Sequence, residues 1–241
     1  MSRPATGWRL WLITLAAALS VAATLALGAW QLSRAEGKRA LQAQIDAQRQ
    51  LPALEASALS SGAPLHRLVT VRGTWLAQHT VFLDNRQMQG RPGFFVLTPL
   101  RIEGGDRTVV VQRGWVPRNF TDRNALPAVP TPDGVVSVTG RIAPPPARLY
   151  EFAGAQTGPI RQNLDLATFA AELKRPLLDL TVVQTGGADD GLQRQWGEPA
   201  TGVEKHLGYA FQWFGLAALI TILYVWFQIV RRVHAQHRPA R

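Results

Sequence analysis

Residues 67–75 read RLVTVRGTW, and at this point the hydrophobic period of the chain changes from helical to alternating. Val69, Val71, Gly73 and Trp75 fall on one face, and Thr70, Arg72 and Thr74 fall on the other. A two-residue period with β-branched residues predicts a half-buried β-strand. The same pattern returns in four further segments: TVFLDN (80–85), FFVLTPL (94–100), RTVVVQRGW (107–115) and GVVSVTGRI (134–142).

Turn-forming residues separate these segments, in GRPG (90–93), EGGD (103–106) and TPDG (131–134), and residues 53–66 read as a loop. DLATFAAEL (165–173) predicts one short helix, with Asp165 as its N-cap and Pro176 just past its end. LLDLTVVQT (177–185) predicts a further strand. We therefore expect a mainly antiparallel β domain of the α+β type, barrel- or sandwich-like, with about six or seven strands.

Two windows without charge flank this domain, Leu10–Ser33 and His206–Val230, with His206 counted as neutral. At 1.5 Å per residue each reaches about 35 Å, which exceeds the roughly 30 Å hydrocarbon core of a bilayer. We expect two transmembrane helices rather than core helices of a soluble domain. The first window is also longer than the apolar core of a cleaved signal peptide. Its helical pattern continues as a stalk that Pro52 ends at the latest.

The basic residues indicate the topology. All 16 acidic residues lie between Arg34 and Glu204, whereas both tails are basic and contain no acid. Because basic tails stay on the cytoplasmic side, we expect both termini inside and the central domain outside. The short stretch before the first helix leaves no room for a transit peptide, which favours a bacterial inner membrane and a periplasmic domain.

The predicted protein is thus multi-pass and has five parts. They are a cytoplasmic tail (1–9), a transmembrane helix (10–33), an extracytoplasmic β-rich domain with a helical stalk (34–205), a second transmembrane helix (206–230) and a basic cytoplasmic tail (231–241).

Composition argues against several functions. The chain has no cysteine, hence no disulfide, thiolate site or C-x-x-C-H haem attachment. It has two methionines, which argues against a copper carrier with sulfur ligands. No concentrated basic face points to nucleic acid. The motifs G-x-S-x-G, H-E-x-x-H, P-loop and G-x-G-x-x-G are absent, so we do not expect an enzyme.

EKHLGYAFQWFG (204–215) places a histidine, His206, at the start of the second apolar helix. Tyr209 and Trp213 follow at three and seven residues, so all three share a helical face. A neutral imidazole is a good ligand for haem iron, and aromatic neighbours can pack a porphyrin edge. The alternative is an ordinary interfacial cluster, since these residue types also gather at headgroup depth.

Two further features of the sequence are open to two interpretations. Gly208, Gln212 and Gly215 form a second face of the same helix, which would pack either on the first helix or on a partner's helix. Arg113 and Arg86 lie near predicted strand ends, in QRGWVP (112–117) and after Asn85. Each arginine could pair with a carboxylate such as a haem propionate, or serve ordinary turn and edge structure.

Several segments together resemble the Surfeit locus protein one family of cytochrome oxidase assembly factors. They are LGAWQLSRAEGKRAL (27–41), VRGTW (71–75), FLDNRQMQGRPGFFVLTPL (82–100), VVVQRGWVP (109–117) and EKHLGYAFQWFGLA (204–217). The match lies in their order, their spacing and the two-helix frame, and it covers nearly the whole chain.

The resemblance implies a function in the maturation of haem-copper terminal oxidases. Bacterial members of the family are associated with binding haem a and delivering it to the catalytic subunit, and the proposed ligand maps onto His206. Expected partners are that subunit, the membrane and the enzymes of haem a synthesis. In this carrier hypothesis the macrocycle lies around Tyr209 and Trp213, and its propionates meet Arg86 or Arg113. The alternative is a cofactor-free scaffold that stabilises oxidase assembly intermediates.

Overall fold

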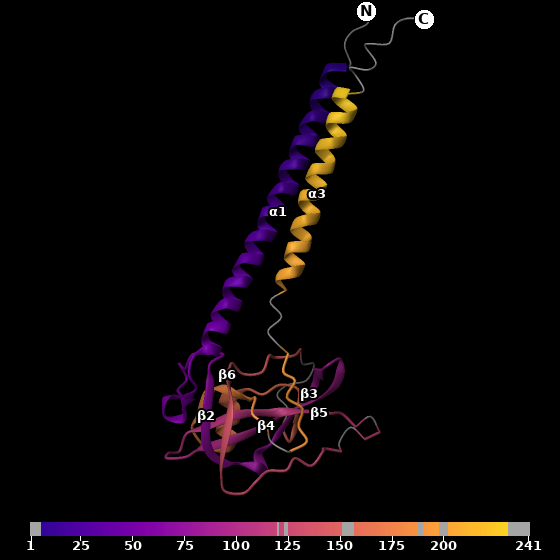
Figure 1. Ribbon diagram of the computed structural model, residues 1–241. Coiled ribbons are helices and arrows are strands. Elements are labelled where there is room, and N and C mark those ends of the chain that lie inside the picture. Colours follow the sequence, from indigo (N-terminus) through magenta and orange to yellow (C-terminus); the bar gives the residue numbers. More distant parts are fainter. Residues whose placement is uncertain are drawn as a thin grey trace, which may run out of the picture. The chain divides into compact units, whose positions relative to one another are not determined.

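A computed structural model describes residues 6–119, 121–122, 125–150, 157–187, 190–197 and 202–230 (Figure 1). The chain forms two compact units. One contains the residues up to Ala43 and those from Ala200 onward, and the other contains Gln44–Pro199. We call them the helical unit and the β unit.

The helical unit is built from α1 (Thr6–Gln50) and α3 (Val203–Val225). The last residues of α1, from Gln44 onward, are counted with the β unit. A π-helical segment, η3 (Trp226–Val230), continues α3. Both helices are long and apolar enough to cross a membrane, judged by length and composition. As predicted, the first helix continues past its apolar window without a break and ends before Pro52.

The two helices of this unit lie side by side in Figure 1. Their buried and half-buried residues recur every three or four positions, at Val21, Thr24, Gly28, Gln31 and Ala35 of α1 and at His206, Ala210, Trp213 and Ala217 of α3. This spacing is that of a seam between two packed helices, and small residues in the seam let the helices approach closely. A Cβ added at Gly28 would lie 2.7 Å from the ring of Phe214.

The face of α3 formed by Gly208, Gln212 and Gly215 does not take part in this seam. All three residues are exposed, and a Cβ at either glycine would meet no atom within 4 Å. The interpretation that this face packs on the first helix is therefore wrong. Ala210 and Ala217, whose exposed fractions are 2% and 4%, do so instead.

The β unit contains one eight-stranded sheet in the order β1-β2-β6-β8-β5-β4-β3-β7. Its strands are β1 (Leu54–Glu55), β2 (Leu68–Trp75), β3 (Val81–Met88), β4 (Arg91–Ile102), β5 (Thr108–Pro117), β6 (Val135–Ala143), β7 (Ile160–Arg161) and β8 (Leu177–Gln184). Because β2 also pairs with β4, the strands β2, β6, β8, β5 and β4 close on themselves. The pairs β1–β2, β3–β7 and β5–β8 are parallel and the others antiparallel. This confirms the mainly antiparallel, barrel-like prediction.

The barrel interior is filled from alternate positions of its strands. Val69 and Val71 of β2 meet Val109 and Val111 of β5 in one fully buried cluster. The predicted loop 53–66 adds Leu59 to this cluster and contains β1 and a 3₁₀ turn, η1 (Ala56–Ala58). A second 3₁₀ turn, η2 (Ala77–His79), connects β2 and β3.

Strand β5 differs from the half-buried prediction, because both of its faces are covered. Val110 points to the outer face, where it packs with Phe169 of α2 (Leu166–Leu173). The N-cap predicted for this helix is confirmed, since Thr168 N–H donates to Asp165 Oδ1 at 2.9 Å. Hydrogen bonds from Thr168 lower the pKa of Asp165.

The hairpin between β3 and β4 also departs from the prediction. Strand β3 does not end at Asn85 but passes through a bulge there, where Asn85 adopts φ 57°. The turn consists of Gln89 and Gly90, with φ of 50° and 74°, and β4 begins at Arg91. Two successive positive φ angles match the twist of the paired strands. The tight turn thus precedes Arg91, Pro92 and Gly93, which the sequence predicts to lie within the turn.

Candidate functional site

His206 lies in the first turn of α3. The helix begins after Gly202, which adopts φ 63°, and His206 N–H reaches the Gly202 carbonyl at 3.4 Å. The imidazole is partly buried on the face turned towards α1. There its Nδ1 atom lies 2.7 Å from Oε1 of Gln31.

Gln31 is not among the site residues that the sequence predicts. It lies 175 positions from His206 along the chain, so no local spacing connects the two. The available signal was weak: one amide in the otherwise apolar stretch LGAWQL (27–32) at the end of the first charge-free window. The pairing follows from the antiparallel seam, which places the end of that window beside the start of α3.

The two aromatic residues predicted beside His206 differ in their surroundings. Trp213 is partly buried in the seam, whereas Tyr209 is 53% exposed. Phe211, on another face, is 80% exposed. The first three turns of α3 therefore present an imidazole, a half-covered indole and an open aromatic side chain, a combination that can accept a flat apolar molecule.

Within the described residues, no three histidine, cysteine or acidic side chains cluster closely enough to hold a metal ion. A single histidine at the start of an apolar helix is compatible with a metal that brings its own macrocycle, as haem iron does.

Arg86 belongs to the β unit and is 6% exposed. Its guanidinium donates to the carbonyl of Ala147 at 2.8 Å and to that of Gln162 at 2.9 Å. Burial lowers the pKa of Arg86. These contacts tie two distant loop segments to β3, and they favour the structural interpretation of Arg86 over the propionate-binding one.

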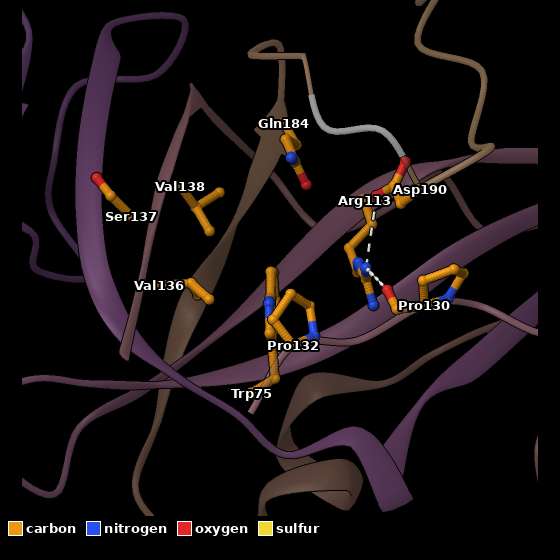
Figure 2. A pocket seen from close by; sticks show the side chains of 9 residues that line it. All are labelled: Trp75, Arg113, Pro130, Pro132, Val136, Ser137, Val138, Gln184 and Asp190. Atoms are coloured by element: carbon orange, nitrogen blue, oxygen red, sulfur yellow. Dashed lines mark hydrogen bonds and ion pairs between the residues drawn. The ribbon is translucent and has the colours of Figure 1, made fainter. Parts of the chain in front are cut away.

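Arg113 is similarly enclosed in the β unit, at 2% exposed. Figure 2 shows its guanidinium between Asp190 and Pro130, with the Asp190 carboxylate 3.4 Å away and the Pro130 carbonyl 2.7 Å away. Thr131 accepts a further hydrogen bond at 2.7 Å, and the ring of Trp75 lies 4.8 Å below the guanidinium carbon. Burial lowers the pKa of Arg113, and Asp190 opposes this shift.

A cavity of about 230 Å³ adjoins Arg113 in the β unit. It is lined by Trp75, Arg113, Pro130, Pro132, Val136, Ser137, Val138, Gln184 and Asp190 (Figure 2). Since the guanidinium already meets a carboxylate, a carbonyl and a hydroxyl, Arg113 is built into the wall of the cavity. As with Arg86, the contacts favour a structural role.

Comparison with known proteins shows that most of this chain is similar to one protein family. The sequence model of the SURF1 family matches residues 18–218. A SURF1-like protein of Rickettsia felis is 29% identical over 210 residues, covering 83% of this chain and 90% of that protein. A SURF1-like protein of Drosophila melanogaster is 28% identical over 94% of this chain and 78% of its own length. The Surfeit locus protein 1 of Arabidopsis thaliana is 32% identical over 43% of this chain and 33% of its own.

Proposed function

Because the chain belongs to the SURF1 family, we propose that it is a membrane assembly factor for a haem-copper terminal oxidase. In this proposal it binds haem a and assists its insertion into the catalytic subunit. It acts as a carrier rather than an enzyme. The observation that supports the carrier role is the position of His206, partly buried in the first turn of a long apolar helix.

The chemistry of haem a fits the residues at this position. Its iron takes an imidazole as an axial ligand, which His206 would supply. Its apolar macrocycle would lie against the start of α3, where Tyr209 is open and Trp213 half-covered. A single protein ligand suits a carrier, because the cargo has to be released to the oxidase.

We also propose the setting in which this carrier works. The two apolar helices span a bacterial inner membrane, with both termini in the cytoplasm and the β unit in the periplasm. The charge distribution supports this topology, since all 16 acidic residues lie within residues 34–205, between the two charge-free windows. The catalytic subunit would receive haem a, and the enzymes of haem a synthesis would supply it.

An optical spectrum of the purified full-length protein, from cells that make haem a, tests the carrier role. Wild type should carry haem a, and His206→Ala should lose most of it at equal protein amounts. His79→Ala serves as a matched control, since His79 lies in η2 of the β unit. Equal haem in wild type and His206→Ala would exclude His206 as the necessary ligand.

A haem-free wild type, isolated despite a demonstrated supply of haem a, would favour the second candidate function. That candidate is a cofactor-free scaffold that holds oxidase assembly intermediates together. The exposed Gly208–Gln212–Gly215 face of α3 favours it, because small residues and an amide allow another membrane helix to pack there. Co-purification with the catalytic subunit does not separate the two functions, since both predict it.

A further inference from the structure

We propose that Gln31 is a positioning residue for His206: its side-chain oxygen binds the Nδ1–H of the imidazole and leaves Nε2 as the atom that ligates iron. The inference rests on the proposed haem-binding function and adds a residue and a specific ring nitrogen to it. The contact that carries it is the 2.7 Å distance between His206 Nδ1 and Gln31 Oε1.

The identity of the two atoms in contact, a ring nitrogen and an amide oxygen, places the proton on Nδ1 in this proposal. Two electronegative atoms 2.7 Å apart need a hydrogen between them, and an amide oxygen has none to give. In the proposed arrangement the proton therefore lies on Nδ1, which donates to the Gln31 oxygen. In a neutral imidazole only one ring nitrogen is protonated, so Nε2 keeps its lone pair and faces away from Gln31.

This tautomer is the one that ligation of a metal through Nε2 requires. Such a histidine typically donates its second ring N–H to a carboxylate, a carbonyl oxygen or a water molecule, which fixes the ring orientation and makes the ligand more basic. Gln31 supplies a carbonyl oxygen of this kind. It does so from α1, so that one helix holds the ligand and the other orients it.

The surroundings keep the pair together. Gln31 and His206 are both partly buried in the seam between the helices. An amide without a hydrogen-bond partner costs free energy when it lies at an apolar contact between helices. The hydrogen bond therefore stabilises the positions of both side chains. One turn before Gln31, Gly28 leaves room for the ring of Phe214 to lie against α1.

Side-chain ¹⁵N NMR of full-length protein without haem tests the tautomer directly. The His206 signals are assigned by their loss in His206→Ala. We expect protonated Nδ1 and unprotonated Nε2 in wild type. Gln31→Ala should shift the ring towards the Nε2–H form. A wild-type ring protonated on Nε2, with the Gln31 amide donating to Nδ1, would overturn the inference.

Haem a titration provides the second readout. Gln31→Ala should weaken binding by about tenfold to a hundredfold, the usual effect of removing such a partner. Gln31→Glu keeps an acceptor at the same place, so it should restore most of the affinity. It should also lower the reduction potential of the bound haem, because a carboxylate makes the imidazole more basic. Gln212→Ala, an exposed glutamine on α3, is the control and should bind like wild type.

The outcomes separate this inference from the function on which it rests. If His206→Ala abolishes haem binding and Gln31→Ala leaves affinity, potential and tautomer unchanged, the carrier function stands and the role of Gln31 fails. If His206→Ala binds haem as wild type does, the proposed ligation itself fails.

Discussion

The indole of Trp115 donates from Nε1 to the main-chain oxygen of Arg86, 2.9 Å away, and thereby joins β5 to β3 across the intervening strand β4. Trp115 is fully buried, and the Arg86 guanidinium holds the loop segments at Ala147 and Gln162. One buried cluster therefore connects three strands and two loops of the β unit.

Trp115→Phe should destabilise the β unit by about 2–4 kcal/mol, because it removes the donor for the Arg86 carbonyl and leaves a void. The measurement is thermal unfolding of the full-length protein in detergent, followed by circular dichroism. Trp11→Phe is the matched control, since Trp11 lies on α1 and is 76% exposed. Equal unfolding temperatures for the two variants would contradict a structural role for the indole.

Gly93→Ala should destabilise the β unit by about 3 kcal/mol or more, because the added methyl group has no space. A Cβ at Gly93 would lie 2.1 Å from the carbonyl oxygen of Val116 and 2.5 Å from the Trp115 indole. Gly105→Ala is the control, since a Cβ there meets no atom within 4 Å. Comparable stability of both variants in denaturant unfolding would show that β4 and β5 are less tightly packed than described.

His66 should make the stability of the β unit fall as the pH drops through the ordinary histidine value of 6.5. Burial, followed by Arg141 and then Arg49, lowers the pKa of His66 in the folded state. The unfolded chain therefore takes up a proton at a higher pH than the folded chain. Protonation thus favours unfolding, and the stabilisation present above this pH is lost below it.

His66→Asn removes the titrating group from this position. Asparagine tolerates the positive φ of 68° better than most residues. The loss of stability between about pH 7.5 and about pH 5.5 should be smaller in the variant than in wild type, although partial exposure of His66 keeps the difference small. Unfolding in denaturant at several pH values measures it. Identical pH profiles would assign the dependence to other groups.

Gly28→Ala should loosen the helical unit although alanine is the better helix former. The substitution gains about 1 kcal/mol of helix propensity. It also places a methyl group 2.7 Å from the Phe214 ring, which has to move. Gly37 lies on the same helix, and a Cβ there would meet no atom within 4 Å. Gly37→Ala should therefore only increase the stability of the helix.

The difference between these two α1 variants can be measured by unfolding in detergent mixtures and by the tautomer of His206. Gly28→Ala should unfold more readily than Gly37→Ala and should shift the His206 ring away from the Nδ1–H form. The opposite order of stability would show that the contact between Gly28 and Phe214 does not hold the helices together.

The elements that sequence alone predicts are those with a local physical signature. The alternation at Val69 and Val71 indicates a strand because one face has to be buried. Asp165 signals a helix start because its carboxylate can bind the free N–H groups that follow it. Both features depend on residues within a few positions of each other, and both are present in the structure.

The features that the sequence does not predict depend on contacts between residues far apart in the chain. An arginine near a strand end is usually solvated, so nothing local distinguishes Arg86 and Arg113, whose acceptors lie in loops far along the chain. The double burial of β5 depends on α2, which follows it by about 50 residues. The pairing of Gln31 with His206 needs the register of two helices, which the composition of either helix does not contain.

The central place of β8 in the sheet has a consequence in time. β8 lies between β5 and β6, although it follows both in the chain. Until Leu177–Gln184 has been synthesised and has reached the folding domain, β5 and β6 each present an open edge to which other chains can add. The barrel therefore closes late, after nearly all of its sequence has been made. Between the synthesis of β6 and the docking of β8, a nascent chain of this protein is most prone to aggregate.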